Sequence, residues 1–141
     1  QDLTGQTVID YGCGSGILGI AALLLGAEKV IAVDNDPQAL LATRDNAERN
    51  NIAPERISTY LPEDLPADVI GQTMLANILA APLIELAPRL TALTASNGLI
   101  CLSGLLEHQI AAVSQPYLAN FSFADPAIET EWAQLAARKT A

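Results

Sequence analysis

A glycine-rich loop separates the first strand-like run of this 141-residue chain from a strongly apolar run. The strand-like run covers residues 7–12, and the apolar run covers residues 17–25. Glycine adopts positive φ without strain and has no Cβ to keep another group away from the main chain. A tight turn needs one or two glycines, whereas Gly12, Gly14 and Gly16 alternate through this loop. The excess predicts that a nucleotide-like ligand lies against the loop, at the carboxyl end of the first strand.

Strand-like and helix-like runs alternate along the rest of the chain. Further strands are expected at residues 29–34, 57–61, 73–77 and 98–104, then a partner strand within 121–128 and a final strand from Trp132. Helices are expected at residues 17–25, 36–50, 82–93 and 106–117. This order is typical of an α/β fold, a doubly wound, mostly parallel sheet of seven strands with helices on both faces and an antiparallel C-terminal strand. The length fits one domain covering residues 1–141.

Charge and composition restrict the possible partners. The formal net charge of −9 repels phosphate backbones, so we expect a basic protein or a small molecule as partner and no direct nucleic-acid binding. The longest apolar run, residues 17–27, is too short to span a membrane. Two cysteines and one histidine give neither a zinc pattern nor a disulfide framework, so we expect no metal and a reducing, cytoplasmic location. Because a strand follows Gln1 almost at once, we expect the chain to be a fragment.

The loop can be aligned with two different ligand-binding motifs. Gly14, Gly16 and Gly19 match the G-x-G-x-x-G pattern of dinucleotide-binding folds. That alignment places Asp10 and Gly12 inside the strand, where both residue types are unfavourable. Starting the count at Asp10 instead ends the strand at the acid and leaves the glycines in the loop. We prefer this second alignment, and NAD binding stays open as the alternative.

Two acids at strand ends indicate the chemistry of the ligand. Asp10, at the end of the first strand, is suited to accept hydrogen bonds from loop N–H groups and from a ligand ammonium, but it would repel a pyrophosphate. Asp34 ends the second strand, where a carboxylate can accept both hydroxyls of a ribose. Its neighbour Asp36, ahead of Pro37, already serves as a helix cap, which leaves Asp34 available. An ammonium at the loop and a ribose at Asp34 together describe S-adenosylmethionine.

Longer stretches of the chain resemble a known family. The chain resembles the class I S-adenosylmethionine-dependent methyltransferases, which have a Rossmann-like fold. Four stretches carry this resemblance: VIDYGCGSGILGIAALLLGA, AVDNDPQAL, ANILAAPL and LSGLL. Within this class the chain resembles the PrmA family of bacterial ribosomal protein methyltransferases, from about Leu3 to the tail. The resemblance implies cofactor contacts at Gly12, Asp34 and Asn77. Further cofactor-binding candidates lie in the same motifs: Asp10, Cys13, Gly14, Gly16 and Asn35.

The resemblance also implies an activity. The chain is expected to be the catalytic domain of a protein N-methyltransferase that acts on amino groups of large-subunit ribosomal protein eleven and releases S-adenosylhomocysteine. An upstream substrate-recognition domain, present in the family, is expected to be absent here. Asn77 is the predicted catalytic residue, which orients the target amine, and a plain helix cap is its alternative role. We expect no carboxylate base beside the methyl group, because a nearby carboxylate raises the pKa of an amine.

Other functions are compatible with the same motifs. They are a methyltransferase for small molecules or glutamine side chains, an NAD-binding oxidoreductase, and a cofactor-binding module without activity. The remaining chemically notable side chains are expected to be structural. We expect Cys13 to fill space and His108 to be solvated, and we expect the aromatic side chains to pack in the core or at a sheet edge: Phe121, Phe123 and Trp132.

Overall fold

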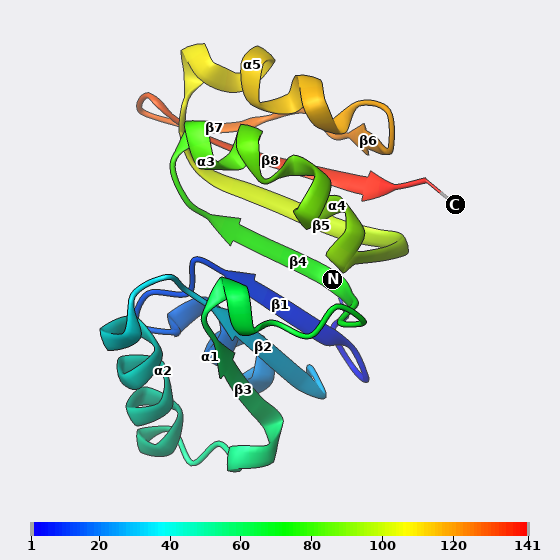
Figure 1. Ribbon diagram of the computed structural model, residues 1–141. Helices are drawn as coiled ribbons and strands as arrows, with labels where there is room; N and C mark the ends of the chain where they lie inside the picture. The colour runs from blue at the N-terminus through cyan, green and yellow to red at the C-terminus, as the bar shows by residue number, and fades with distance from the viewer. Residues whose placement is uncertain (1, 141) are drawn as a thin grey trace. The chain divides into compact units, whose positions relative to one another are not determined.

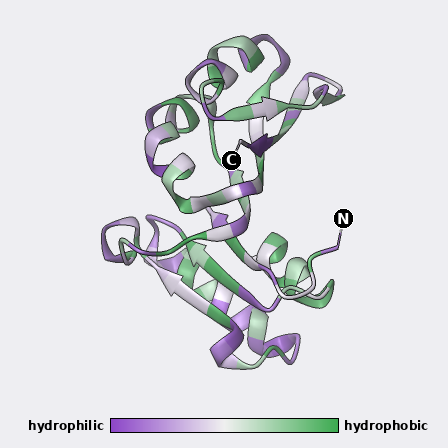
Figure 2. Cartoon of the chain, turned by 90° about the vertical axis from the view of Figure 1, so that its right-hand side faces the viewer, coloured by the Kyte–Doolittle hydropathy of each residue, from purple (hydrophilic) through white to green (hydrophobic). Residues whose placement is uncertain are grey.

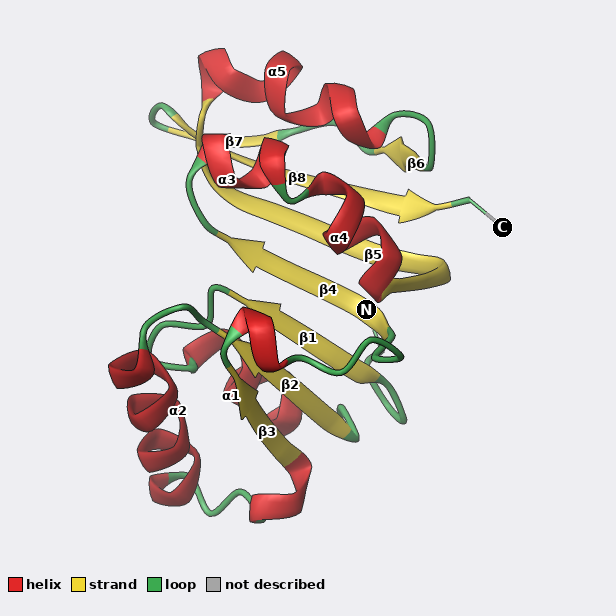
Figure 3. Cartoon of the chain, in the orientation of Figure 1, coloured by secondary structure: helices red, strands yellow, loops and turns green. Residues whose placement is uncertain are grey.

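The computed structural model describes residues 2–140, and Figure 1 labels their helices and strands. The chain divides after Gly71 into two compact units. Each unit contains both strands and helices, as the colours of Figure 3 show. Within the described residues, no helix has the length and apolar character needed to cross a membrane.

The first unit is built on three parallel strands in the order β3-β2-β1. The bounds are Thr7–Tyr11 for β1, Lys29–Val33 for β2 and Ile57–Tyr60 for β3. Helices α1 (Ile17–Leu24) and α2 (Pro37–Arg49) contact each other and pack against the strands, and the 3₁₀ turns η1 (Pro54–Arg56) and η2 (Pro62–Asp64) flank β3. Because the strands are parallel, the loops that follow β1 and β2 lie at the same edge.

Burial and capping account for the elements of this unit. Strands β1 and β2 are buried after their first residue and are predominantly apolar. Figure 2 colours the chain by hydropathy. Helix α2 begins after Asp36, whose Oδ1 accepts a hydrogen bond from the N–H of Gln38, and Pro37 occupies the first turn. The predicted cap is therefore confirmed. Helix α1 begins after Gly16, which has no side chain to serve as a cap.

The second unit has the strand order β4-β5-β8-β6, and β7 also pairs with β8. Its strands are β4 (Gly71–Asn77), β5 (Thr94–Leu106), β6 (Phe121–Phe123), β7 (Ala127–Glu129) and β8 (Trp132–Lys139). Strand β8 is antiparallel to β5, β6 and β7. The helical segments are α3 (Ala80–Glu85), α4 (Ala87–Leu93), η3 (Glu107–Gln109), α5 (Ile110–Ser114) and η4 (Gln115–Tyr117).

The predicted fold class is confirmed, with parallel strands near the N-terminus and antiparallel strands at the C-terminus. Several boundaries differ from the prediction. Helix α3 begins at Ala80 rather than Pro82, because a proline in the first helical turn lacks only an N–H that has no intrahelical partner. The expected strand within residues 121–128 is two short strands, so residues 2–140 contain eight strands rather than seven. The expected helix at 106–117 is divided by 3₁₀ turns.

Candidate functional site

The glycine loop follows β1 directly and has the left-handed backbone that glycine permits. Gly12, Gly14 and Gly16 have φ values of 79°, 55° and 86°. Gly19 lies instead within α1, where an added Cβ would be 2.9 Å from Cγ1 of Val30 on β2. The loop glycines are therefore those of the preferred alignment, and Gly19 serves the close packing of α1 on β2.

Hydrogen bonds within the first unit hold the N–H groups of this loop. The N–H groups of Gly12 and Cys13 both donate to the carbonyl oxygen of Val33, at 2.7 and 3.0 Å. The N–H of Gly14 donates to Oδ2 of Asp34 at 3.0 Å. These bonds join the loop after β1 to the end of β2. The two chain segments therefore form one preformed rim.

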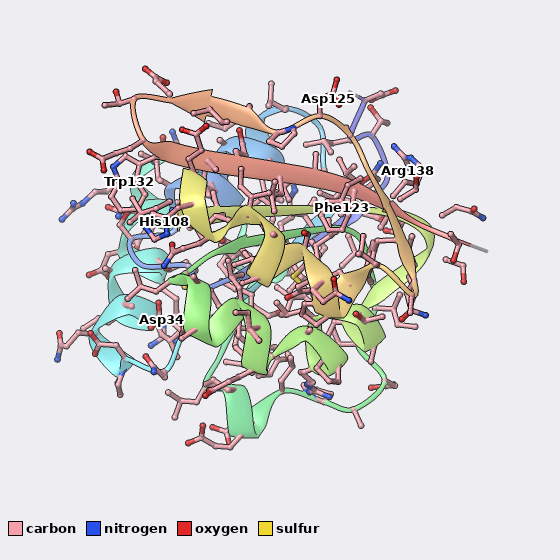
Figure 4. The ribbon with its side chains drawn as sticks, turned by 90° about the horizontal axis from the view of Figure 1, so that it is seen from above. Asp34, His108, Phe123, Asp125, Trp132 and Arg138 are labelled. Carbon is pink, nitrogen blue, oxygen red and sulfur yellow. The ribbon has the colours of Figure 1, made fainter. Side chains whose placement is uncertain are left out.

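Asp34 is the half-buried acid at the end of β2, labelled in Figure 4. Besides the bond from Gly14 to Oδ2, its Oδ1 accepts a hydrogen bond from the N–H of Asp36 at 3.0 Å. The carboxylate thus has structural bonds that the sequence did not predict. A carboxylate offers about four acceptor positions, so about two remain for the hydroxyls of a ligand. Asn35, the next residue, is exposed beside it.

Asp10 is buried in β1, with 1% of its surface exposed. Its Oδ2 accepts a hydrogen bond from the N–H of Gly19 at 3.1 Å, in the first turn of α1 rather than in the loop. Its Oδ1 is buried and has no hydrogen-bond partner within residues 2–140. Burial raises the pKa of Asp10 to about 6, with the Gly19 bond opposing this shift and the charge of Asp34 adding to it. An unpartnered, buried carboxylate oxygen suits a nearby cation.

The side chain of Cys13 is directed at α2. Its Sγ lies 3.4 Å from Oγ1 of Thr43, and 7% of the residue is exposed. Burial raises the pKa of the thiol to about 11. A thiol that stays protonated at neutral pH is a poor nucleophile. These observations agree with the expected space-filling role, and a cofactor contact by Cys13 would come from its main chain.

Asn77 ends β4 in the second unit and is exposed. The N-cap of α3 is Leu79, and no side-chain hydrogen bond caps that helix. The alternative role of Asn77 as a helix cap is therefore excluded. Its Oδ1 lies beside Gly104 of β5, 3.2 Å from the point where a Cβ of that glycine would stand.

Gly104 belongs to the same site, although sequence reasoning did not single it out. It has a φ of 92° and marks a shift of register in the β5–β8 pairing. An added Cβ would be 2.5 Å from the carbonyl oxygen of Ile78, so glycine lets the chain after β4 pass against β5. The LSGLL stretch contains this glycine, but a glycine within a strand pattern does not show which other segment of the chain lies against it.

A groove of about 800 Å³ opens beside Asn77, lined by the end of β4, the bulge of β5, and strands β7 and β8. Its lining includes Leu79, Ile128, Glu129 and Trp132. Trp132 is 53% exposed, so its expected packed position is wrong. The side chain lies at the same end of the β5–β8 pair as the exposed His108, whose solvation was predicted (Figure 4).

The aromatic and metal predictions have different outcomes. Phe121 is buried and Phe123 is half-buried, as expected for packing residues. Within residues 2–140, no three side chains of histidine, cysteine, aspartate or glutamate lie together so that they could hold a metal ion. The expectation that the function needs no metal stays a prediction.

The raised pKa of Asp10 predicts a pH-dependent stability. Because the folded-state pKa of about 6 lies above the ordinary value of 3.8, the folded chain binds the proton more tightly than the unfolded chain. Stability should therefore fall as pH rises from about 4 to about 7, by roughly 2–3 kcal/mol. In Asp10→Asn this contribution is absent, so the variant should gain stability relative to the unmodified chain over that range. Urea unfolding at several pH values measures the difference, and a difference that does not vary with pH would contradict this account.

Comparison with known proteins identifies the family. The family described as ribosomal protein L11 methyltransferase (PrmA) matches residues 1–140. Ribosomal protein L11 methyltransferases of Escherichia coli (strain K12 / DH10B) and Shigella boydii serotype 18 are each 52% identical to the chain over 139 residues. The match covers 98% of this chain and 47% of each relative, so the chain spans about half the length of these relatives.

Solved structures share the fold. A ribosomal protein L11 methylase from Lactobacillus delbrueckii subsp. bulgaricus has a TM-score of 0.88 and 31% identity, covering 99% of this chain and 72% of that one. A methyltransferase from Pyrococcus furiosus has a TM-score of 0.79 and 15% identity, covering 100% of this chain and 78% of that one. A putative methyltransferase complexed with SAH (S-adenosylhomocysteine) has a TM-score of 0.79 and 12% identity, covering 98% of this chain and 46% of that one. The last two show the fold alone. This chain belongs to the ribosomal protein L11 methyltransferase (PrmA) family.

Proposed function

We propose that this chain is the S-adenosylmethionine-binding, catalytic part of an enzyme that methylates amino groups of ribosomal protein L11. The observation that carries the proposal is the rim of the glycine loop and Asp34, in a chain 52% identical to L11 methyltransferases. When bound, S-adenosylmethionine supplies an activated methyl group, and S-adenosylhomocysteine is the product. Membership of the methyltransferase family that matches residues 1–140 supports this choice of cofactor.

The first unit offers groups that fit this cofactor. The remaining acceptor positions of Asp34 suit the hydroxyls of the ribose. An added Cβ at Gly14 would meet nothing within 4 Å, so the main chain there is open to a ligand. The unpartnered Oδ1 of Asp10 suits the ammonium of the amino-acid moiety, because a buried negative charge stabilises a nearby cation even without direct contact.

Asn77 is proposed to orient the acceptor amine. Asn77 is exposed and does not cap α3, so its amide oxygen can accept a hydrogen bond from an amine and direct the amine lone pair. A lysine amine has a reference pKa of ~10.4, so its deprotonation costs roughly 4–5 kcal/mol at neutral pH. The apolar side chains that line the groove, Leu79 and Ile128 among them, reduce this cost, because burial disfavours the charged amine.

The protein substrate is proposed from the chain's charge and its relatives. A net charge of −9 attracts a basic protein and steers its approach. The relatives contain about as much chain again outside the matched 139 residues. We propose that recognition of ribosomal protein L11 resides in that part, that the reaction takes place in the cytoplasm, and that it involves neither a metal nor direct binding of nucleic acid or membrane.

A thermal-shift screen tests the choice of cofactor. We expect S-adenosylmethionine and S-adenosylhomocysteine to stabilise the chain and NAD to have no effect. The NAD alternative counts Gly19 as a ligand glycine, whereas Gly19 packs α1 onto Val30. Stabilisation by NAD alone would favour the oxidoreductase, and an unchanged melting temperature with all three compounds would contradict cofactor binding by this chain.

Replacement of Asp34 tests the ribose contact. Asp34→Ala removes a charge-assisted hydrogen bond worth ~1.5–3 kcal/mol, so affinity for S-adenosylhomocysteine should fall on the order of 10- to 100-fold. Titration calorimetry measures the affinity. The matched control is Asp36→Ala, which removes the cap of α2 and about 1 kcal/mol of stability but should not change affinity. Equal affinity in Asp34→Ala and the unmodified chain would remove Asp34 from the site.

Replacement of Asn77 tests the positioning of the acceptor. In a protein that includes the additional chain found in the relatives, Asn77→Ala should lower kcat for methylation of L11 by at least about tenfold, because the amine loses its orienting acceptor. The unfolding stability should change by less than about 0.5 kcal/mol. Asn120→Ala, an exposed asparagine of the same unit outside the groove, should change neither quantity. If stability and kcat fall together in Asn77→Ala, the residue has a structural role instead.

A further inference from the structure

Helix α2 holds the glycine loop through two side chains. The hydroxyl of Thr43, a residue with 0% of its surface exposed, donates to the carbonyl oxygen of Gly14 at 3.1 Å. Asn46, one turn further along the helix, donates from Nδ2 to the carbonyl oxygen of Ser15 at 2.9 Å. An added Cβ at Gly16 would be 2.7 Å from Cγ2 of Thr43, so helix and loop are already in close contact.

These two bonds fix the direction of consecutive peptide groups. In a trans peptide the C=O and the following N–H point in opposite directions. With the carbonyl of Gly14 turned toward α2, the N–H of Ser15 is turned away from α2. With the carbonyl of Ser15 also tied to α2, the N–H of Gly16 points away as well, and it donates to the carbonyl oxygen of Cys13 at 2.8 Å. Helix α2 therefore determines which groups the loop presents on its opposite face.

We propose that Thr43 and Asn46 are positioning residues of the cofactor site. This inference rests on the proposed function, since it requires that the loop holds S-adenosylmethionine. A glycine-rich segment has more accessible backbone conformations than any other, so ordering it on binding is costly. Two hydrogen bonds from a helix order the loop before the ligand arrives, and less binding free energy is then lost.

The helix itself does not depend on these two bonds. Its packing comes from the buried side chains of Leu40 and Ala47, and its first turn is capped by Asp36. Valine has nearly the shape of threonine, so Thr43→Val keeps the contact with Gly16. It replaces with a methyl group the hydroxyl that binds the carbonyl oxygen of Gly14 and lies 3.4 Å from Sγ of Cys13. The substitution therefore releases the loop carbonyl with little change in the position of α2.

The test combines a binding measurement with a measurement on the free chain. In Thr43→Val and in Asn46→Ala we expect affinity for S-adenosylhomocysteine, measured by titration calorimetry, to fall about three- to tenfold. We expect hydrogen exchange of the amides of residues 14–16, measured by NMR without ligand, to become faster by a similar factor. Thr43→Ser restores the hydroxyl and should restore both quantities.

Two variants separate positioning from general stability. Thr94→Val removes another buried hydroxyl, which donates to the carbonyl oxygen of Leu90 at 2.8 Å in the second unit. Asn50→Ala removes the side-chain amide of the residue that follows α2, which donates to the carbonyl oxygen of Asn46 at 2.8 Å and not to the loop. Both controls should leave the affinity and the loop exchange unchanged.

The outcomes distinguish this inference from the proposed function. If the unmodified chain binds S-adenosylhomocysteine and Thr43→Val and Asn46→Ala bind it equally well, the positioning role is overturned and the proposed function stands. An equal loss of affinity in Thr94→Val would assign the effect to stability and also overturn the positioning role. Failure of the unmodified chain to bind would overturn both.

Discussion

Contact between bare main chain and a neighbouring element sets the geometry of the candidate site. At Gly16 the loop lies against Thr43 of α2, and at Gly19 helix α1 lies against Val30 of β2. A Cβ at either position would come within 3 Å of the neighbouring side chain. The distances between loop, helices and strands therefore depend on glycine. In the second unit Gly104 has the same role, because it admits the carbonyl of Ile78. Both edges that carry candidate residues are thus built on positions where any larger residue would push elements apart.

The first unit contains one buried carboxylate, Asp10, and one half-buried carboxylate, Asp34. Folding stability alone does not explain why charged groups stand at these two positions. Asp10 is buried with one oxygen unpartnered, and the charge of Asp34 contributes to its raised pKa. An uncharged residue at position 10 would avoid the desolvation of the carboxylate. A perturbed, buried acid next to a ligand loop is typical of a functional site. A cation bound at the loop would lower the pKa of Asp10 and offset this cost, so cofactor binding and the protonation of Asp10 should be thermodynamically linked.

The sequence predicted those parts of the site whose structure is determined by residues close together along the chain. The glycine loop and the cap at Asp36 each arise within a few residues, and their residue types report the local backbone. Thr43 was expected only as part of the buried side of its helix, since its partner Gly14 lies 29 residues away. Trp132 is 53% exposed beside the paired strands β7 and β8, and this pairing is not encoded in local composition. Sequence reasoning therefore singled out the two acids beside the loop and missed the α2 side chains that bind the loop carbonyls.

The groove beside Asn77 combines two kinds of lining residue that would have opposite effects on the pKa of a bound amine. Glu129 is an exposed carboxylate in its lining, and Trp132 presents a half-exposed indole. A carboxylate and an aromatic face both attract a protonated lysine from solvent, the indole through a cation–π contact. The same carboxylate close to the reacting nitrogen would raise the pKa of the amine and oppose the loss of its proton. The apolar side chains of Leu79 and Ile128 would have the opposite effect on an amine packed against them, because loss of water favours its neutral form. Under the proposed function, such a groove would attract the cation at an exposed acid and favour its neutral form among apolar side chains. The uncharged Asn77 would then orient the lone pair without holding the proton on the nitrogen.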